Sequence, residues 1–433
     1  MFPHLFSSSI SQAVVLLILV SATKTKALTR TSQQCVHFPA GRLEWVSHFT
    51  TCPLPEVIAN DTGKDEAPIS WSFPPSCITP PATENNTSPR ADCLFTSTTF
   101  RNGHGISLVA SAVTTSQLIG SGSFNDEPLP LAAQQRESLG SAYKIVTVEG
   151  KGMGVTAARH IKRGEIIMMD YPAVLIGTSF LANSKPHHRR RVLKRAIKQL
   201  PKGTRKKVEG LSKGREEYEV DALLGPNANT VLIGEEGGGQ VHVGLFPETA
   251  RINHACRPNA HSRFSERRLT MEVMAHRAIE AGEEITMSYV PITTPIEERK
   301  KYLKEHWGFD CTCSLCRSSP EHIEESESWR RRQKSLKSTI QDATSGEYYS
   351  DAIAMSEEWL QFADWDMVPP LAPEYHDSLA DLYFKTGDMM NATRYARMAY
   401  DGWVKFGSVD DEKLENARLL VDKLGKISEE KRR

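Results

Sequence analysis

The sequence predicts an α+β protein with a β-rich middle and an all-α C-terminal region. β-branched runs separated by glycine turns occupy residues 141–177, and strand character returns over residues 268–290; both features are typical of short strands. From about residue 320 onward, apolar residues recur at three- and four-residue spacing, which indicates amphipathic helices. A cluster of closely spaced cysteines lies between these two regions, and it predicts a small knuckle there.

The composition is that of a folded globular chain. Of its 433 residues, 39% are hydrophobic and 24% are charged, which argues against a disordered protein and suggests about two to three domains. Lysine plus arginine equals aspartate plus glutamate at 53 each, so the net charge identifies no partner.

The N-terminus carries one apolar run, from Ala13 to Ala22. It is too short to cross a bilayer, which needs about 20 apolar residues, but it matches the hydrophobic part of a signal peptide. We therefore expect residues 1–28 to be a signal peptide that directs the protein to the secretory pathway or outside the cell. A chance apolar leader on a nuclear or cytoplasmic protein is the alternative. No other stretch predicts a membrane span.

Residues 29–140 are rich in proline, serine and threonine, and they contain half of the eight cysteines. Together with a secretory leader, these cysteines predict two disulfides in any of three connectivities; a loop-rich extension with free thiols is the alternative. The cysteines are Cys35, Cys52, Cys77 and Cys93, and acceptor triplets for N-glycosylation begin at Asn60, Asn85 and Asn86.

Residues 178–240 are expected to be an insertion between strands. From Lys185 to Arg215 there are thirteen lysines and arginines against one acid, Glu209. We favour a solvated helix face for this run, with docking of an acidic partner or of nucleic acid as the alternative. Because the run contains no phenylalanine, tyrosine or tryptophan, stacking of single-stranded bases is disfavoured.

The segment CTCSLC places Cys311, Cys313 and Cys316 within six residues. A structural zinc site needs four ligands in a tetrahedron, and the only other cysteine in the second half of the chain is Cys256. We therefore expect a structural zinc ion to join Cys256 to the late triplet. Free thiols or disulfides are the alternative, although a bridge between the neighbours of a Cys-x-Cys pair would be strained.

Four short motifs follow one another in the order GKGMGV, RINHACRPN, GEEITMSY and GFDCTCSLC. This order resembles the SET domain and post-SET zinc knuckle of protein lysine methyltransferases, most of all the SET and MYND domain branch and fungal SET domain-containing proteins. The resemblance is strong over residues 141–317 and loose beyond them. The chain departs from that branch because residues 178–240 lack the set of cysteine and histidine ligands that forms a MYND finger.

The resemblance also suggests how the chain is divided. We expect a SET domain over residues 141–292 that contains the basic insertion, a post-SET knuckle over residues 293–317, and a helical region over residues 318–433. Within the helical region, a TGD turn separates two amphipathic segments, and this pair resembles one tetratricopeptide unit. The helical region is a candidate surface for a protein partner.

The resemblance implies transfer of a methyl group from S-adenosylmethionine to the side-chain amine of a protein lysine. Gly152 and Gly154 would let the backbone approach this cofactor closely, and an ordinary glycine turn is the alternative. Asn253 and His254 would hold its amino end and adenine, although a lone histidine is more often a core residue. The cofactor-binding residues that the resemblance implies are Lys151, Gly152, Met153, Gly154, Asn253, His254, Tyr289 and Phe309.

Tyr289, which ends the motif GEEITMSY, is the predicted catalytic residue. Its phenol would orient the lysine amine and line the methyl-transfer channel, and an ordinary core tyrosine is the alternative. Phe309 resembles an aromatic residue that covers the adenine ring, whereas Glu283 and Glu284 are expected to be turn and surface residues. The alternative function is a catalytically inactive SET protein that binds partners through its helical region and basic insertion.

Overall fold

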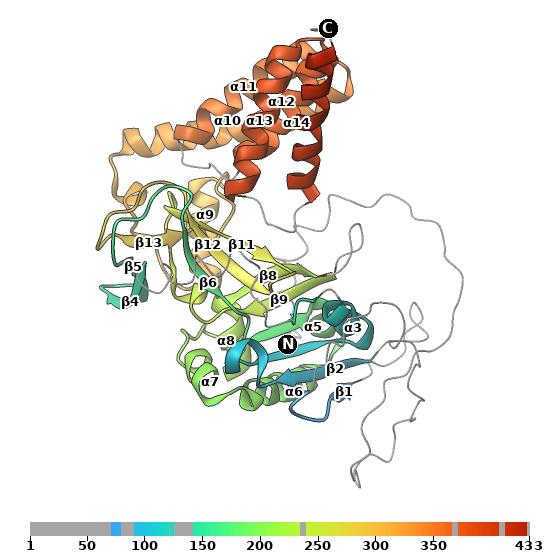
Figure 1. Ribbon diagram of the computed structural model, residues 1–433. Helices are drawn as coiled ribbons and strands as arrows, with labels where there is room; N and C mark the ends of the chain where they lie inside the picture. Colours follow the sequence, from blue (N-terminus) through green and yellow to red (C-terminus); the bar gives the residue numbers. More distant parts are fainter. Residues whose placement is uncertain are drawn as a thin grey trace, which may run out of the picture. The chain divides into compact units, whose positions relative to one another are not determined.

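The computed structural model describes most of the chain from residue 71 onward (Figure 1). The described segments are residues 71–78, 91–120, 122–124, 142–233, 240–365, 371–406 and 412–430. The expected leader, the three glycosylation triplets, Cys35 and Cys52 lie outside the described residues, so those expectations remain predictions.

The chain divides into two compact units that alternate along the sequence. The first unit consists of Met1–Asp126, Ala173–Lys206 and Asn229–Gly244. The second consists of Glu127–Pro172, Lys207–Ala228 and Leu245–Arg433.

The first unit contains a six-stranded sheet in the order β1-β2-β3-β7-β9-β8. The strands are β1 (Ser76–Ile78), β2 (Asp92–Ser97), β3 (Ile106–Ser111), β7 (Val174–Gly177), β8 (Ala228–Ile233) and β9 (Gln240–Leu245). All residues of β2 and β7 are buried, as expected for central strands covered on both faces. The composition of residues 29–140 does not predict β2 and β3, which are therefore a finding of the structure.

Helices of the first unit include the basic run noted in the sequence. They are α2 (Phe100–Gly103), α3 (Ala112–Gly120), α5 (Thr178–Asn183), α6 (Pro186–Gln199) and α7 (Lys202–Glu209), of which α7 extends past the end of the unit. The buried residues of α6 are Val192, Leu193 and Ala196. The basic run is therefore helical, with its apolar side chains on one face.

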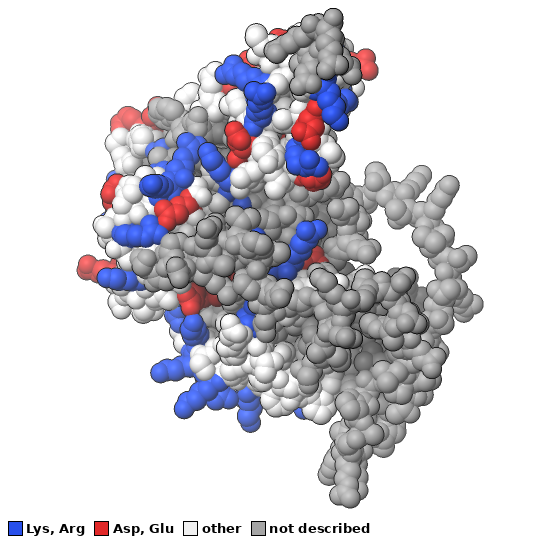
Figure 2. Space-filling model, viewed as in Figure 1, with Lys and Arg blue, Asp and Glu red and all other residues white. Residues whose placement is uncertain are grey.

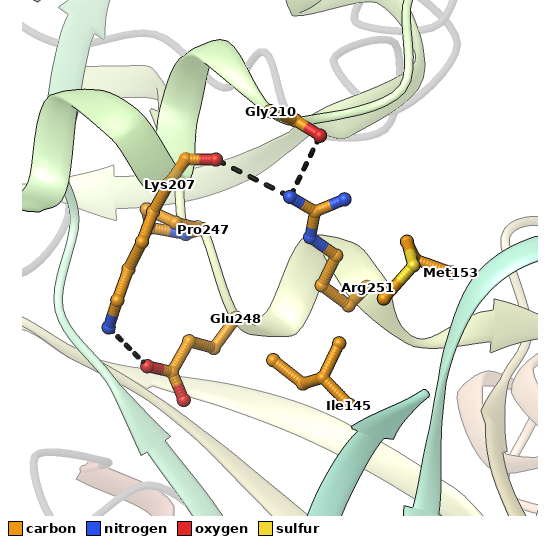
Figure 3. Close-up of a pocket in the computed structure, with 7 residues that line it drawn as sticks. All are labelled: Ile145, Met153, Lys207, Gly210, Pro247, Glu248 and Arg251. Atoms are coloured by element: carbon orange, nitrogen blue, oxygen red, sulfur yellow. Dashed lines mark hydrogen bonds and ion pairs between the residues drawn. The ribbon is translucent and has the colours of Figure 1, made fainter. Parts of the chain in front are cut away.

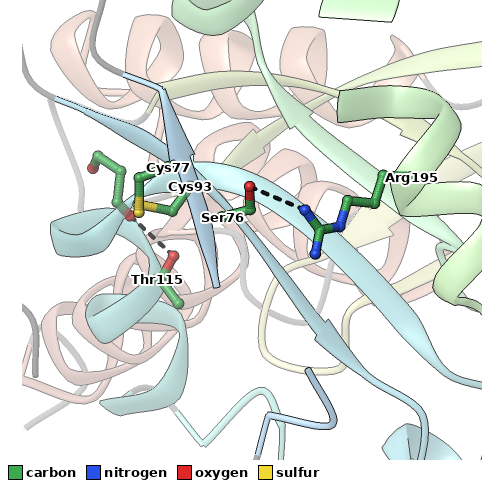
Figure 4. The surroundings of a disulfide bond; sticks show 6 residues. Ser76, Cys77, Cys93, Thr115 and Arg195 are labelled. Carbon is green, nitrogen blue, oxygen red and sulfur yellow. Dashed lines mark hydrogen bonds between the residues drawn. A yellow bond between two sulfur atoms is a disulfide. The ribbon is translucent and has the colours of Figure 1, made fainter. Parts of the chain in front are cut away.

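One disulfide bond lies at the edge of this sheet (Figure 4). Cys77 of β1 is bonded to Cys93 of β2, and the two residues are direct partners in the antiparallel register. Next to the bond, Arg195 of α6 donates to the Ser76 hydroxyl at 3.4 Å. The disulfide therefore ties the short edge strand β1 to the buried strand β2.

The second unit contains two sheets, in the orders β10-β13-β5-β4 and β11-β12-β6. Their strands are β4 (Tyr143–Val148), β5 (Gly152–Ala157), β6 (Ile166–Asp170), β10 (Asn253–His254), β11 (Ala260–Ser265), β12 (Thr270–Ala275) and β13 (Glu284–Met287). Apolar residues from both sheets, among them Val155, Ile167, Val273 and Ile285, form one buried core. This core supports the segments that carry the sequence motifs.

The remaining described elements are mostly helices, which confirms the predicted α+β class. They are α8 (Glu219–Asn227), η1 (Thr249–Arg251), α9 (Ile296–His306), η2 (Leu315–Arg317), α10 (Pro320–Ser345), α11 (Tyr349–Trp365), α12 (Ala372–Lys385), α13 (Met389–Phe406) and α14 (Glu412–Glu430). The TGD turn separates α12 from α13, and Gly387 adopts φ +82° there, a conformation that favours glycine after a helix end. In the described part of the chain, no helix combines the length and apolarity needed to cross a membrane.

A buried ion-pair network joins α10 to the cysteine-bearing segment of the second unit. Arg330 of α10 is completely buried and donates to the carbonyl oxygens of Cys256, at 3.0 Å, and Ile292. One turn earlier, Glu327 accepts a hydrogen bond from Arg299 of α9 at 2.7 Å. Buried charges are tolerated only when they are paired and hydrogen-bonded, so this network fixes where α10 packs.

Replacement of Arg330 by methionine should lower the free energy of unfolding by about 3–5 kcal/mol, because it leaves the buried Glu327 carboxylate with one cation fewer. Denaturant titration followed by circular dichroism measures the change. Arg331→Gln removes an exposed arginine from the same helix and should change stability by no more than about 0.5 kcal/mol. Equal stability of the two variants would contradict this assignment.

Candidate functional site

Four cysteine sulfurs lie together in the second unit, although Cys256 is distant in sequence from Cys311, Cys313 and Cys316. The four Sγ atoms are all within 4.8 Å of one another, and that of Cys256 is 3.6 Å from Cys316 and 3.9 Å from Cys311. A disulfide needs about 2.05 Å, whereas sulfurs about 2.3 Å from a central zinc are about 3.8 Å apart in a tetrahedron. The cluster therefore fits a four-thiolate metal site.

His254 connects this cysteine cluster to Tyr289. The histidine is 4% exposed, and its Nδ1 accepts a hydrogen bond from the backbone N–H of Tyr289 at 3.0 Å. Its Nε2 lies 3.5 Å from the sulfur of Cys256. Because Nδ1 is the acceptor, a neutral imidazole carries its proton on Nε2 and directs it toward the sulfur. Both ring nitrogens are thus used within the protein.

Tyr289 follows β13 and is surrounded by aromatic side chains. Its ring centroid is 5.1 Å from that of Trp307 and 6.4 Å from that of Phe309, and its hydroxyl donates to the carbonyl oxygen of Ile252 at 2.8 Å. Burial, together with the charge of Glu284, raises the pKa of Tyr289 above its usual value. The phenol is therefore neutral at physiological pH.

The GKGMG motif forms the turn between β4 and β5 and the start of β5. Gly152 has φ +74°, and the space beside its Cα is open. A Cβ atom on Gly154 would lie 2.8 Å from Nδ2 of Asn253, which is too close for a real side chain. Glycine at position 154 therefore lets Asn253 approach the backbone of β5.

Glu284, the first residue of β13, joins two of the predicted cofactor residues. Its carboxylate lies 2.5 Å from Nζ of Lys151 and accepts a hydrogen bond from Nδ2 of Asn253 at 2.9 Å. The expectation that Glu284 is a turn and surface residue is wrong, because its side chain is 20% exposed and holds these two groups together. The role of Glu284 could not be predicted from the sequence, because Lys151 and Asn253 are both distant from it in the chain.

Asn259 holds the C-terminal end of the RINHACRPN segment, which comprises residues 251–259. It is 2% exposed, its Nδ2 donates to the carbonyl oxygen of Glu284 at 2.9 Å, and its Oδ1 accepts from the backbone N–H of Thr286 at 2.8 Å. These bonds join the segment to β13, the strand that precedes Tyr289. The segment is thus held at one end by Asn259 and near Cys256 by the cysteine cluster.

A cavity of about 320 Å³ opens beside Met153 of β5 (Figure 3). Within it, Lys207 and Glu248 form an ion pair at 2.6 Å, and Arg251 donates to the carbonyl oxygen of Gly210 at 2.9 Å. The complete lining is Ile145, Met153, Lys207, Gly210, Pro247, Glu248 and Arg251. Of the predicted cofactor residues, Met153 is the one that reaches this cavity, which combines apolar and charged walls.

A buried carboxyl group positions the η1 turn that leads into Asn253. Asp170, the last residue of β6, is 4% exposed, and its Oδ2 accepts from the backbone N–H groups of Glu248 and Thr249, both at 2.8 Å. Burial raises the pKa of Asp170 to about 7 despite these hydrogen bonds, and the charge of Glu248 raises it further. Proton uptake by Asp170 therefore occurs near neutral pH.

Trp307 belongs to the aromatic group around Tyr289. Unlike Phe309, it was not predicted from the sequence. It follows α9, packs against Tyr289, and its Nε1 donates to the carbonyl oxygen of Pro226 at 3.1 Å. Phe309, which was predicted, lies 6.2 Å from the ring of His254. The motif WGFDC contains the available signal, since Trp307 lies two positions before Phe309 in the same loop as the cysteine triplet.

Comparison with known proteins identifies the class of this site. Residues 152–290 match the model of the SET domain. The chain is 32% identical over 192 residues to histone-lysine N-methyltransferase set5 of Schizosaccharomyces pombe, covering 44% of this chain and 55% of that protein. It is 34% identical over 124 residues to histone-lysine N-methyltransferase SMYD3 of Mus musculus, covering 28% of each.

A SET and MYND domain-containing protein of Dictyostelium discoideum is 34% identical over 93 residues, which are 22% of this chain and 26% of that protein. The chain thus spans about half, or less, of the length of the curated relatives it matches. Residues 152–290 are a SET domain, and the expected resemblance to SET and MYND domain proteins and to a fungal SET protein is confirmed.

Asp170 should make stability depend on pH. The carboxyl has a pKa of about 3.9 when unfolded and about 7 when folded, so the folded state binds the proton more tightly. Stability should therefore fall as pH rises from about 4 to 7, by up to about 1.4 kcal/mol per pH unit. Asp170→Asn keeps an oxygen acceptor but cannot ionise, and it should flatten this dependence in calorimetric unfolding.

The matched control is Asp342→Asn, which changes an exposed aspartate of α10 and should leave the pH dependence as in the wild type. If Asp170→Asn retained the full slope, the buried carboxyl would not be its origin.

Proposed function

We propose that the protein is an S-adenosylmethionine-dependent protein-lysine N-methyltransferase. The observation that carries the proposal is the joint position of Tyr289, the Asn253–His254 pair and the GKGMG turn within one unit. Relatives named histone-lysine N-methyltransferases support a histone lysine as the first substrate to test.

The chemical groups around the GKGMG turn fit the proposed cofactor. Space is open beside Gly152, and the Met153 side chain is 38% exposed at the edge of the cavity. Lys151, which forms an ion pair with Glu284, would exchange this partner for the cofactor's carboxylate. Asn253 donates its amide nitrogen to Glu284 and would offer its amide oxygen to the cofactor's amino group. The residues that would hold the cofactor are Lys151, Gly152, Met153, Gly154, Asn253, His254, Tyr289 and Phe309. When bound, S-adenosylmethionine supplies an electrophilic methyl group.

His254 would act on the cofactor through its backbone, because both of its ring nitrogens are already engaged. Its imidazole has a different task in this proposal. It holds the backbone of Tyr289 on one side and contacts the Cys256 sulfur on the other, so it transmits the position of the cysteine cluster to the catalytic tyrosine.

Tyr289 would orient the lysine amine. Its neutral phenol donates to Ile252 and retains a lone pair that can accept an N–H from the substrate. A free lysine amine costs about 4–5 kcal/mol at neutral pH, because the usual lysine pKa is about 10.4. The rings of Trp307 and Phe309 beside Tyr289 would disfavour the charged form and so reduce this cost, while alignment of the amine would supply the remaining acceleration.

The metal site would be structural. Four cysteines complete a tetrahedral zinc shell and leave no coordination position for substrate or water. Its role in the proposal is to hold the loop that carries Trp307 and Phe309 against the segment that carries Asn253 and His254.

Tyr289→Phe should retain cofactor affinity within about threefold and lose about 100-fold or more in turnover, since the ring remains while the orienting hydroxyl is lost. Isothermal titration with S-adenosylmethionine measures the binding, and transfer of a labelled methyl group to core histones measures the turnover. Tyr302→Phe removes the hydroxyl of another tyrosine, whose ring packs on Trp307, and should behave as the wild type.

Failure of the wild type to bind S-adenosylmethionine would overturn the proposed enzyme and favour an inactive SET protein that acts by binding partners. Cofactor binding with full turnover by Tyr289→Phe would instead overturn only the role of this tyrosine.

Cys256→Ser should abolish stoichiometric zinc binding and weaken S-adenosylmethionine binding at least tenfold, because loss of one of four ligands releases the loop that carries Phe309. Metal analysis of the purified protein and calorimetry measure the two effects. The double variant Cys77→Ser/Cys93→Ser removes cysteines of the disulfide instead and should keep its zinc. A wild-type protein purified without zinc would contradict the metal assignment.

A further inference from the structure

A basic surface lies on α6 and on the start of α7 in the first unit. Because α6 buries Val192, Leu193 and Ala196, residues on its opposite side face solvent. The basic surface is defined by the exposed side chains Arg191, Lys194, Arg195, Lys198, Lys202 and Lys206. Figure 2 shows lysine and arginine side chains projecting at the lower left, where Figure 1 draws α7.

The fold holds this surface rigidly. The Ser107 hydroxyl of β3 donates to the carbonyl oxygen of Ala196 at 2.9 Å, and the Thr96 hydroxyl of β2 donates to Gln199 Oε1 at 2.8 Å. Both bonds lie on the buried side of α6, so the cations on the other side project from a fixed scaffold.

Among the described residues, no acid neutralises the cations of the basic surface. Helix α6 contains no aspartate or glutamate, and within the described residues none of the six side chains forms an ion pair with a carboxylate. The polar contact of Arg195 is with the neutral Ser76 hydroxyl. The surface thus concentrates positive charge on a chain whose formal net charge is zero.

This arrangement carries a cost to folding. Arg191 and Arg195, and likewise Lys194 and Lys198, are four residues apart on one helix face, where like charges destabilise by about 0.2–0.5 kcal/mol per pair. The first turn of α6 also lacks the acidic residues that would favour the positive end of its dipole. A polyanion on this surface would relieve the repulsion that the protein leaves uncompensated.

The chemistry of the surface favours nucleic acid over an acidic protein. Protein interfaces are built around apolar and aromatic residues at their centre, whereas no large hydrophobic side chain is exposed on α6 or α7. Neither helix contains a phenylalanine, tyrosine or tryptophan on which single-stranded bases could stack. Arg191 and Lys198 are about 10 Å apart along the helix, from a rise of about 1.5 Å per residue, a distance that spans several phosphates of a duplex.

We propose that this basic surface binds the phosphate backbone of double-stranded nucleic acid without sequence preference. The proposal depends on the charge and geometry of α6 and α7, and it is independent of methyl transfer. It would place a second binding function on the first unit, whereas the residues assigned to the cofactor belong to the second unit.

The test uses the full-length, zinc-loaded protein and a fluorescent 30-base-pair duplex of arbitrary sequence, with anisotropy measured from 50 to 200 mM salt. The wild type should bind with an affinity that falls steeply with salt. The triple variant Arg191→Gln/Lys194→Gln/Lys198→Gln should bind at least tenfold more weakly at low salt. The slope of log affinity against log salt should be less negative by about 2–3, since each lost phosphate contact contributes about 0.9 to the slope.

The matched control is Lys300→Gln/Lys334→Gln/Lys337→Gln, which removes three exposed cations from α9 and α10. It should bind the duplex as the wild type does. The thermal midpoint of the α6 variant should be unchanged or higher, because like-charge repulsion is removed.

Four results would overturn the proposal: no salt-dependent binding of the duplex, equal losses in the α6 and control variants, tighter binding of a single strand of the same length, or stronger competition by a polyglutamate of equal charge. The last result would assign the surface to an acidic protein segment. If the wild type showed no methyl transfer, the enzyme proposal would fail, but these binding results would still test the nucleic-acid proposal.

Discussion

The contact of Cys256 with the cysteine triplet is the constraint on which the architecture of the site depends. The sulfurs of Cys256 and Cys316 are 3.6 Å apart, although 60 positions separate them in the chain. This contact brings the loop that contains Trp307 and Phe309 onto the segment that contains His254. Closing a chain loop of this length has an entropic cost. A metal ion bound by the four thiolates would offset this cost, because metal-binding free energy becomes folding free energy.

The position of Tyr289 follows from the same constraint. Its backbone is held by His254, whose other ring nitrogen faces the Cys256 sulfur, and its ring packs on Trp307. Each of these contacts comes from a segment that the cysteine cluster fixes. Asn259 holds the remaining side through hydrogen bonds to β13. The tyrosine is therefore oriented from several directions, as its proposed role of aligning two reactants requires.

Sequence motifs located the residues of the site better than they described how those residues are held. Four cysteines and an uncommon order of motifs sufficed to expect a SET domain, because such patterns are readable along the chain. The roles of Glu284, Arg330 and Trp307 depend on partners that only the folded chain brings near. Strands β2 and β3 were missed for a similar reason, since their place in a central sheet is set by pairing with β7 rather than by local composition.

The buried arginines connect the cysteine cluster to the C-terminal helices. Arg299 and Arg330 share one carboxylate, that of Glu327, so the three residues carry a net positive charge in the interior. Four thiolates around a divalent ion carry a net charge of about −2, and Arg330 donates to the backbone of Cys256. A loaded metal site would thus balance the charge of this network. Helix α10 is therefore part of the same electrostatic unit as the cysteine cluster, and its docking should be most favourable when all four sulfurs are bound to metal.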